Sequence, residues 1–85
     1  MSDSLPLRVM VLDTWDEVRI DAPDTARVAE ITQRALEQSR IPRSAESYVL
    51  KHRGWEVAET ATLAEAGIGP NAALIVLPRR RQPVR

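Results

Sequence analysis

The segment TLAEAGIGPNAALIVLPRRR, residues 62–81, decides the fold because it contains an apolar run that needs neighbours on both sides. Its Thr-Leu-Ala-Glu start is typical of a short helical turn, and a Gly-Ile-Gly-Pro-Asn turn follows at residues 67–71. The apolar run at residues 74–77 is stopped by Pro78, which three arginines follow. A strand this apolar is typical of the interior of a sheet. We therefore expect an earlier strand on each side of it.

The composition indicates one small domain without a long-range electrostatic field. The chain has 85 residues, and its 12 basic and 12 acidic residues cancel, which does not favour a nucleic-acid partner. It has no cysteine, so it can form neither a disulfide framework nor a thiolate metal site. No apolar run approaches the roughly 20 residues of a membrane span, and no secretory leader is recognisable. We expect a cytoplasmic protein and, from its preference for arginine over lysine, a bacterial one.

The first half of the chain predicts a hairpin followed by a helix. Residues 7–12 would place Leu7, Val9 and Val11 on one side of a strand and Arg8, Met10 and Leu12 on the other, and apolar and polar residues alternate at 17–22, after a polar turn at 13–16. The period then changes, and Asp24 or Thr25 is suited to cap the start of a helix. Apolar positions with helical spacing follow at Val28, Ile31, Thr32, Ala35 and Leu36.

The second half predicts three more strands. The Ile-Pro pair at 41–42 ends the helix, since a residue before proline avoids the α region. A third strand is expected at 47–51, a short edge strand at 55–57, and a helical turn within 60–67. Gly67 would cap that turn, with Leu63 and Ile68 pointing into the core. The last strand is best placed beside the first, at the centre of the sheet.

Together these elements predict an α+β fold: a mixed sheet of four or five strands, one long helix across one face, and a short helical turn. We expect the domain to span residues 7–78. Residues 1–6 are expected to be a disordered N-terminus, and residues 79–85 a flexible basic tail.

This order of elements resembles the ubiquitin-like β-grasp family over residues 7–80. Four strings carry the resemblance: Asp-Thr at 24–25, Ile-Pro at 41–42, TLAEAGI at 62–68, and the strand at 74–77 followed by arginines. The family's protein modifiers and sulfur carriers act through a C-terminal Gly-Gly carboxylate, where the close approach of an activating enzyme requires glycine. Residues 81–85 read RQPVR, and no Gly-Gly pair stands upstream. We therefore expect a non-conjugating member.

Two bacterial groups of the family lack the glycine tail and are similar in size. One is the YukD-like proteins associated with type VII secretion. The other is the small ubiquitin-like subunit of toluene-type monooxygenases, which the strings KHR at 51–53 and TLAEAGIGPN at 62–71 favour. The resemblance implies a partner from a secretion system or an oxygenase, and the second group implies an accessory subunit without chemistry of its own. The sequence leaves both open.

No residue pattern indicates catalysis, a cofactor or a metal. His52 is the single histidine and lies in a predicted turn between two cations. Asp13 and Asp16 have ordinary reasons to stand in a turn, and Gly67-Ile68-Gly69 is a helix cap and a turn, not a phosphate loop. We expect no enzymatic activity.

The predicted outward face of the sheet is the candidate site. Alternation places Met10, Val49, Ile75 and Leu77 away from the helix, where side-by-side strands would form an apolar patch. Trp15 in the first hairpin loop would lie at its rim as an anchor. Arg79 and Arg80 would assist by docking on an acidic partner, the alternative being a solubilising tail. The sequence thus predicts a non-catalytic module that binds a partner protein, with self-association through the same patch left open.

Overall fold

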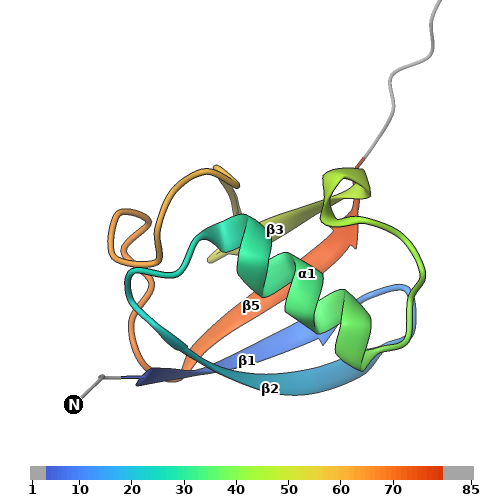
Figure 1. Ribbon diagram of the computed structural model, residues 1–85, viewed down its shortest axis with the longest axis horizontal. Helices are drawn as coiled ribbons and strands as arrows, with labels where there is room; N and C mark the ends of the chain where they lie inside the picture. Colours follow the sequence, from blue (N-terminus) through green and yellow to red (C-terminus); the bar gives the residue numbers. More distant parts are fainter. Residues whose placement is uncertain (1–3, 80–85) are drawn as a thin grey trace, which may run out of the picture.

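The computed structural model describes residues 4–79, which form five strands, one α-helix and one 3₁₀ turn (Figure 1). In chain order these are β1 (Ser4–Val11), β2 (Asp16–Pro23), α1 (Val28–Gln38), η1 (Ala45–Ser47), β3 (Tyr48–His52), β4 (Trp55–Val57) and β5 (Ala72–Pro78). The predicted α+β fold and the predicted sequence of elements are confirmed.

The sheet has the strand order β2-β1-β5-β3-β4, with β5 at its centre. β5 runs parallel to β1 and antiparallel to β3. Its inward residues Leu74 and Val76 are buried, as the apolar run predicted, and the three-residue strand β4 lies at the edge. The segment from which the prediction began therefore joins the two halves of the domain.

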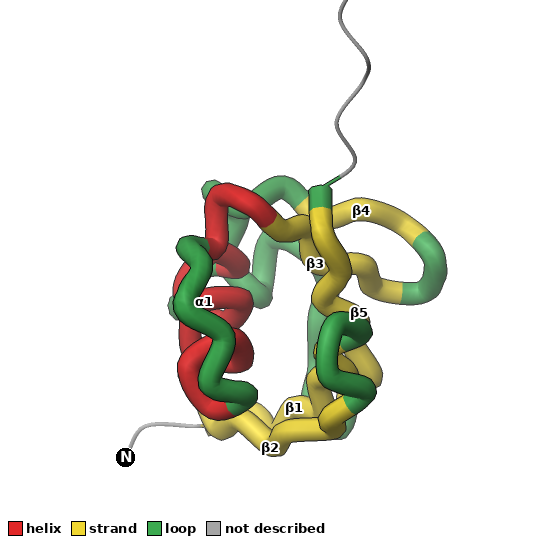
Figure 2. The backbone as a smooth tube through the Cα atoms, turned by 90° about the vertical axis from the view of Figure 1, so that its right-hand side faces the viewer, coloured by secondary structure: helices red, strands yellow, loops and turns green. Residues whose placement is uncertain are grey.

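Helix α1 lies across one face of this sheet, as the side view in Figure 2 shows. Its buried positions are those predicted from the helical spacing: Val28, Ile31, Thr32, Ala35 and Leu36. The Thr32 hydroxyl is buried but not left without a partner, because it donates a hydrogen bond to the carbonyl of Val28 at 3.2 Å. The opposite face of the sheet carries no helix of the described residues.

The start of α1 differs from the prediction. Asp24 and Thr25 do not cap the helix, because they form a turn in which the Ala26 amide donates to the Pro23 carbonyl. The helix begins at Val28, and no side chain caps it. Its first two amides donate instead to backbone carbonyls of residues 61 and 59, at 2.9 and 3.0 Å. These carbonyls satisfy the amides that a capping side chain would otherwise bind.

The end of α1 is a Schellman motif built around an arginine. The helix ends at Gln38, and Arg40 adopts a left-handed conformation with φ of 59°. The Arg40 amide donates to the Glu37 carbonyl and the Ile41 amide to the Leu36 carbonyl, the two bonds of this motif. Ile41 then packs against the core.

The ends of the domain extend further than expected. Residues 4–6, which we expected in a disordered N-terminus, belong to β1 and pair with residues 21–23 of β2.

The predicted helical turn is a single turn. The Ala66 amide donates to the Thr62 carbonyl, and Thr62 and Glu65 exchange side-chain-to-amide hydrogen bonds of 3.1 and 2.9 Å. Gly67 follows with φ of 74°.

Candidate protein-interaction surface

Four of the predicted site residues come together on the outward face of the sheet. Met10 of β1 is the direct cross-strand partner of Ile75 of β5, and Leu77 of β5 is the partner of Val49 of β3. Side chains of direct partners share a face. The four residues therefore form a contiguous cluster on the face opposite α1.

This cluster is accessible. Ile75 is 41% exposed, and Met10, Val49 and Leu77 are half-buried. Leu12 adds to the cluster, because its amide donates to the Val76 carbonyl at 3.0 Å and so extends the pairing of β1 with β5 beyond Val11. Alternation already places Leu12 on the same side as Met10, and this was the signal that could have included it. We call Met10, Leu12, Val49, Ile75 and Leu77 the outward patch.

Trp15 lies in the turn between β1 and β2, at the end of the sheet where Leu12 stands. It is 75% exposed and adopts φ of 56°, which is uncommon for a residue with a large side chain. Its amide donates to the Leu12 carbonyl at 3.3 Å. Trp15 is therefore highly exposed, and its backbone is hydrogen-bonded to Leu12 of the outward patch.

The turn that carries Trp15 is tied to the third strand. The Tyr48 hydroxyl donates a 2.6 Å hydrogen bond to a carboxylate oxygen of Asp13. Burial raises the pKa of Tyr48 above 10.0, and the hydrogen bond to Asp13 and the charge of that carboxylate raise the pKa further. The hydrogen bond from this buried phenol fixes the position of the loop.

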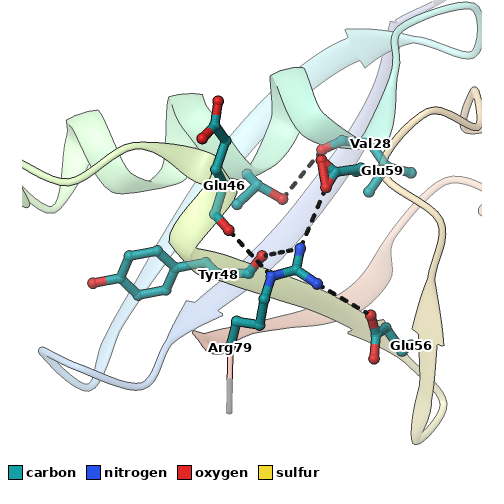
Figure 3. A network of polar contacts seen from close by, with 7 residues as sticks. Val28, Glu46, Tyr48, Glu56, Glu59 and Arg79 are labelled. Atoms are coloured by element: carbon teal, nitrogen blue, oxygen red, sulfur yellow. Dashed lines mark hydrogen bonds and ion pairs between the residues drawn. The ribbon is translucent and has the colours of Figure 1, made fainter. Parts of the chain in front are cut away.

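Arg79 is not part of a flexible tail. Its Nε donates to the Glu46 carbonyl at 3.1 Å, and its Nη2 lies 3.4 Å from the Tyr48 carbonyl and 3.3 Å from the Glu59 carboxylate (Figure 3). A weaker ion pair of 4.0 Å joins it to Glu56. The Arg79 amide also donates to the Ser47 carbonyl. This arginine clamps the end of β5 to η1, β3 and the loop after β4, so its charge is already matched. Arg80, the other predicted docking cation, lies outside the described residues.

Trp55 was not predicted as a surface feature, yet it is 78% exposed. It follows the two-residue turn Arg53-Gly54 of the β3–β4 hairpin and is the cross-strand partner of His52. His52, expected in a turn, is the last residue of β3. Nothing in the periodicity of a three-residue strand tells which face its tryptophan occupies, so sequence reasoning had no signal here.

The described residues hold no group of three or more histidine, cysteine, aspartate or glutamate side chains placed to bind a metal ion. Among residues 4–79 there is also no helix with the length and apolar character that a membrane span needs.

The sheet order, with β5 between β1 and β3 and α1 across one face, defines a ubiquitin-like β-grasp fold. A de novo designed protein based on ubiquitin superposes with a TM-score of 0.80 at 21% identity, over 96% of each chain. The ubiquitin of Caldiarchaeum subterraneum gives 0.77 at 12% identity, over 95% of this chain and 100% of its own. The N-terminal ubiquitin-like domain of the 4931431F19Rik protein gives 0.77 at 15% identity, over 100% of this chain and 84% of that one. No family model and no curated protein matches the sequence.

Proposed function

We propose that this chain is a non-catalytic ubiquitin-like module that binds a partner protein through the outward patch. One observation carries the proposal. The paired residues Met10–Ile75 and Leu77–Val49 place apolar side chains side by side, and accessible, on the face of the sheet that no described helix covers. Contiguous apolar surface of this kind is typical of contact sites.

The chemistry of the patch supports binding and not a reaction. Its side chains are aliphatic or thioether groups, which supply buried area and packing but no nucleophile and no acid or base. Trp15 supports the same conclusion, since tryptophan is enriched among the residues that contribute most to binding at protein interfaces. Its left-handed backbone conformation raises the free energy of the unbound domain, and a role in binding would explain why this conformation is kept.

The proposal does not depend on Arg79. A free cation at this position would support electrostatic docking, but the guanidinium bonds within its own domain. The affinity for a partner should therefore come from the apolar side chains and Trp15. The resemblance of the sequence to secretion-associated and oxygenase-associated proteins suggests these two classes of partner.

Two single variants test the proposal. Val49→Asp and Ile75→Asp each place a carboxylate in the patch, which a desolvated interface disfavours. We expect either one to abolish capture of the partner from the native host, identified by mass spectrometry against the wild type. Trp55→Ser is the control, because it removes an exposed apolar residue outside the patch.

Each variant must first show the wild-type far-UV circular dichroism and a cooperative unfolding transition. Retained capture by both aspartate variants, or equal loss with Trp55→Ser, would reject the outward patch as the binding surface.

A further inference from the structure

Two arginines stand directly opposite each other beside the outward patch. Arg8 of β1 and Arg19 of β2 are cross-strand partners, and both are exposed. They lie on the outward face, because Arg8 is two residues from Met10 along the strand. Side chains of direct partners start from Cβ atoms about 5 Å apart, and like charges in this position are destabilising.

Nothing within the described residues neutralises this pair by an ion pair. In residues 4–79 every ion pair involves Arg79. The carboxylates nearest in register are Asp21 and Glu17, which stand two residues on either side of Arg19 and diagonally from Arg8. A surface hollow of about 340 Å³ lies beside the pair, lined by Pro6, Leu7, Arg8, Arg19, Asp21 and Asn71. Two arginines against one aspartate leave its charged lining net positive.

An anionic group placed between two guanidinium groups can accept charge-assisted hydrogen bonds from both, and arginine forks suit the planar carboxylate. A local arrangement that lowers the stability of the free domain, and that a carboxylate would relieve, is typical of a functional site. On β2 the neighbour of Met10 is Glu17, which disfavours a second carboxylate beside the patch. Along β1 the apolar contact at Met10 and Ile75 is therefore followed by a site for an anion at Arg8 and Arg19, while on β3 the direct partner of Ile75 is another cation, Lys51.

We propose that Arg8 and Arg19 bind an aspartate or glutamate of the partner protein, next to the apolar side chain that the partner places on Met10 and Ile75. This inference rests on the proposed function and specifies the partner's chemistry. Arg8 and Met10 are two strand residues apart, about 6.6 Å. A partner segment matches this distance if its acidic residue is two positions from the apolar anchor in an extended segment, or four in a helix.

The test is a selection from a random peptide library displayed on phage. The wild type is compared with Arg8→Gln/Arg19→Gln, with Met10→Ser/Ile75→Ser, and with Arg34→Gln, which removes an arginine on α1. Wild type and Arg34→Gln should select apolar peptides with an aspartate or glutamate at one of these two spacings. Arg8→Gln/Arg19→Gln should select apolar peptides without that acidic residue, and Met10→Ser/Ile75→Ser should select neither.

Fluorescence anisotropy with one selected peptide then separates the two contacts. Replacing its acidic residue by the amide should weaken binding to the wild type about tenfold and leave binding to Arg8→Gln/Arg19→Gln unchanged, which is the signature of a direct coupling. Binding to the wild type should also weaken with added salt.

The outcomes are distinguishable. Apolar peptides without an acidic preference, bound equally by wild type and Arg8→Gln/Arg19→Gln, would overturn this inference and leave the proposed function standing. Selection that does not depend on Met10 and Ile75 would overturn the proposed function itself. Displacement of the peptide by a short single-stranded DNA oligonucleotide at lower concentration than by the unlabelled peptide would overturn the assignment of the arginine pair to a protein carboxylate.

Discussion

Arg79→Ala is expected to destabilise the domain by about 1.5 kcal/mol, because the arginine side chain fastens the end of β5 to three other segments. Two of its contacts are charge-assisted hydrogen bonds to the carbonyls of Glu46 and Tyr48, at 3.1 and 3.4 Å. The second is long, and we assign about 1 kcal/mol to both together. The ion pairs to Glu59 and Glu56 involve side chains that are about half exposed. Water screens them, so they add about 0.5 kcal/mol.

Urea unfolding followed by far-UV circular dichroism measures this loss. For a domain of this size a loss of 1.5 kcal/mol lowers the melting temperature by about 6–12 °C. Arg79→Lys keeps the positive charge but lacks the planar guanidinium group that donates several hydrogen bonds at once. It should therefore recover less than half of the lost stability. High salt should remove only the smaller, ion-pair part.

Arg34→Ala is the matched control, since the Arg34 side chain donates one hydrogen bond, to the Asp21 carbonyl. It should lower stability by about 0.5 kcal/mol or less. The reasoning is refuted if Arg79→Ala unfolds at the same urea concentration as the wild type, or if the two alanine variants lose equal stability. Either result would return Arg79 to the role of an unattached basic residue available to a partner.

Two further predictions concern stability. Arg40→Gly and Arg53→Asn should each raise the free energy of unfolding by about 0.5–1 kcal/mol in urea titrations, because both arginines have left-handed backbones (φ of 59° and 56°) that glycine or asparagine adopts at lower energy; an unchanged or lower midpoint would contradict this. Tyr48 is the single tyrosine, so the absorbance of tyrosinate should titrate above pH 10.0 in the folded protein and near pH 10 in urea. Because its folded pKa is the higher one, its contribution to stability is complete below pH 10 and is lost as the pH rises through the folded value. Tyr48→Phe should lack this alkaline loss, and an identical alkaline decline in both proteins would disprove the assignment.

The interior of the fold could be predicted because its signals are periodic. The alternation of inward and outward residues in the strands and the 3.6-residue spacing of apolar residues in α1 both follow from which side chains the core buries. Both patterns can therefore be recognised from the sequence. The central place of β5 followed from its apolar run. The helix start could not be predicted in the same way, because carbonyls of residues 59 and 61 satisfy the first amides of α1. Those carbonyls belong to residues 30 and 33 positions further along the chain than the amides that donate to them, and no local sequence pattern predicts the contact.

The surface could be predicted in part. Alternation correctly grouped Met10, Val49, Ile75 and Leu77 on one face, and their role in binding stays a prediction. The reading of Arg79 as tail was wrong, because three consecutive arginines look alike in sequence. Only the tertiary position of Glu59 and of two carbonyls on η1 and β3 distinguishes the first of them. The Arg8–Arg19 pair could not be predicted, because the cross-strand partners in a hairpin depend on its register, and the register depends on the length of the turn.

The places where this chain departs from local rules fall into two groups with different causes. At Arg40 the left-handed residue closes a Schellman motif and brings Ile41 onto the core, and at Arg53 it forms the two-residue turn of the β3–β4 hairpin, so the fold accounts for both. Core packing does not account for Trp15 or for the Arg8–Arg19 pair. The tryptophan is exposed, and the two arginines stand opposite each other on neighbouring strands. Both lie on the β1–β2 hairpin, which also contributes Met10 and Leu12 to the outward patch. Features that lower the stability of the free domain and gather on one hairpin beside an apolar patch are better explained by a partner than by folding. The hairpin is therefore where selection for binding should be sought.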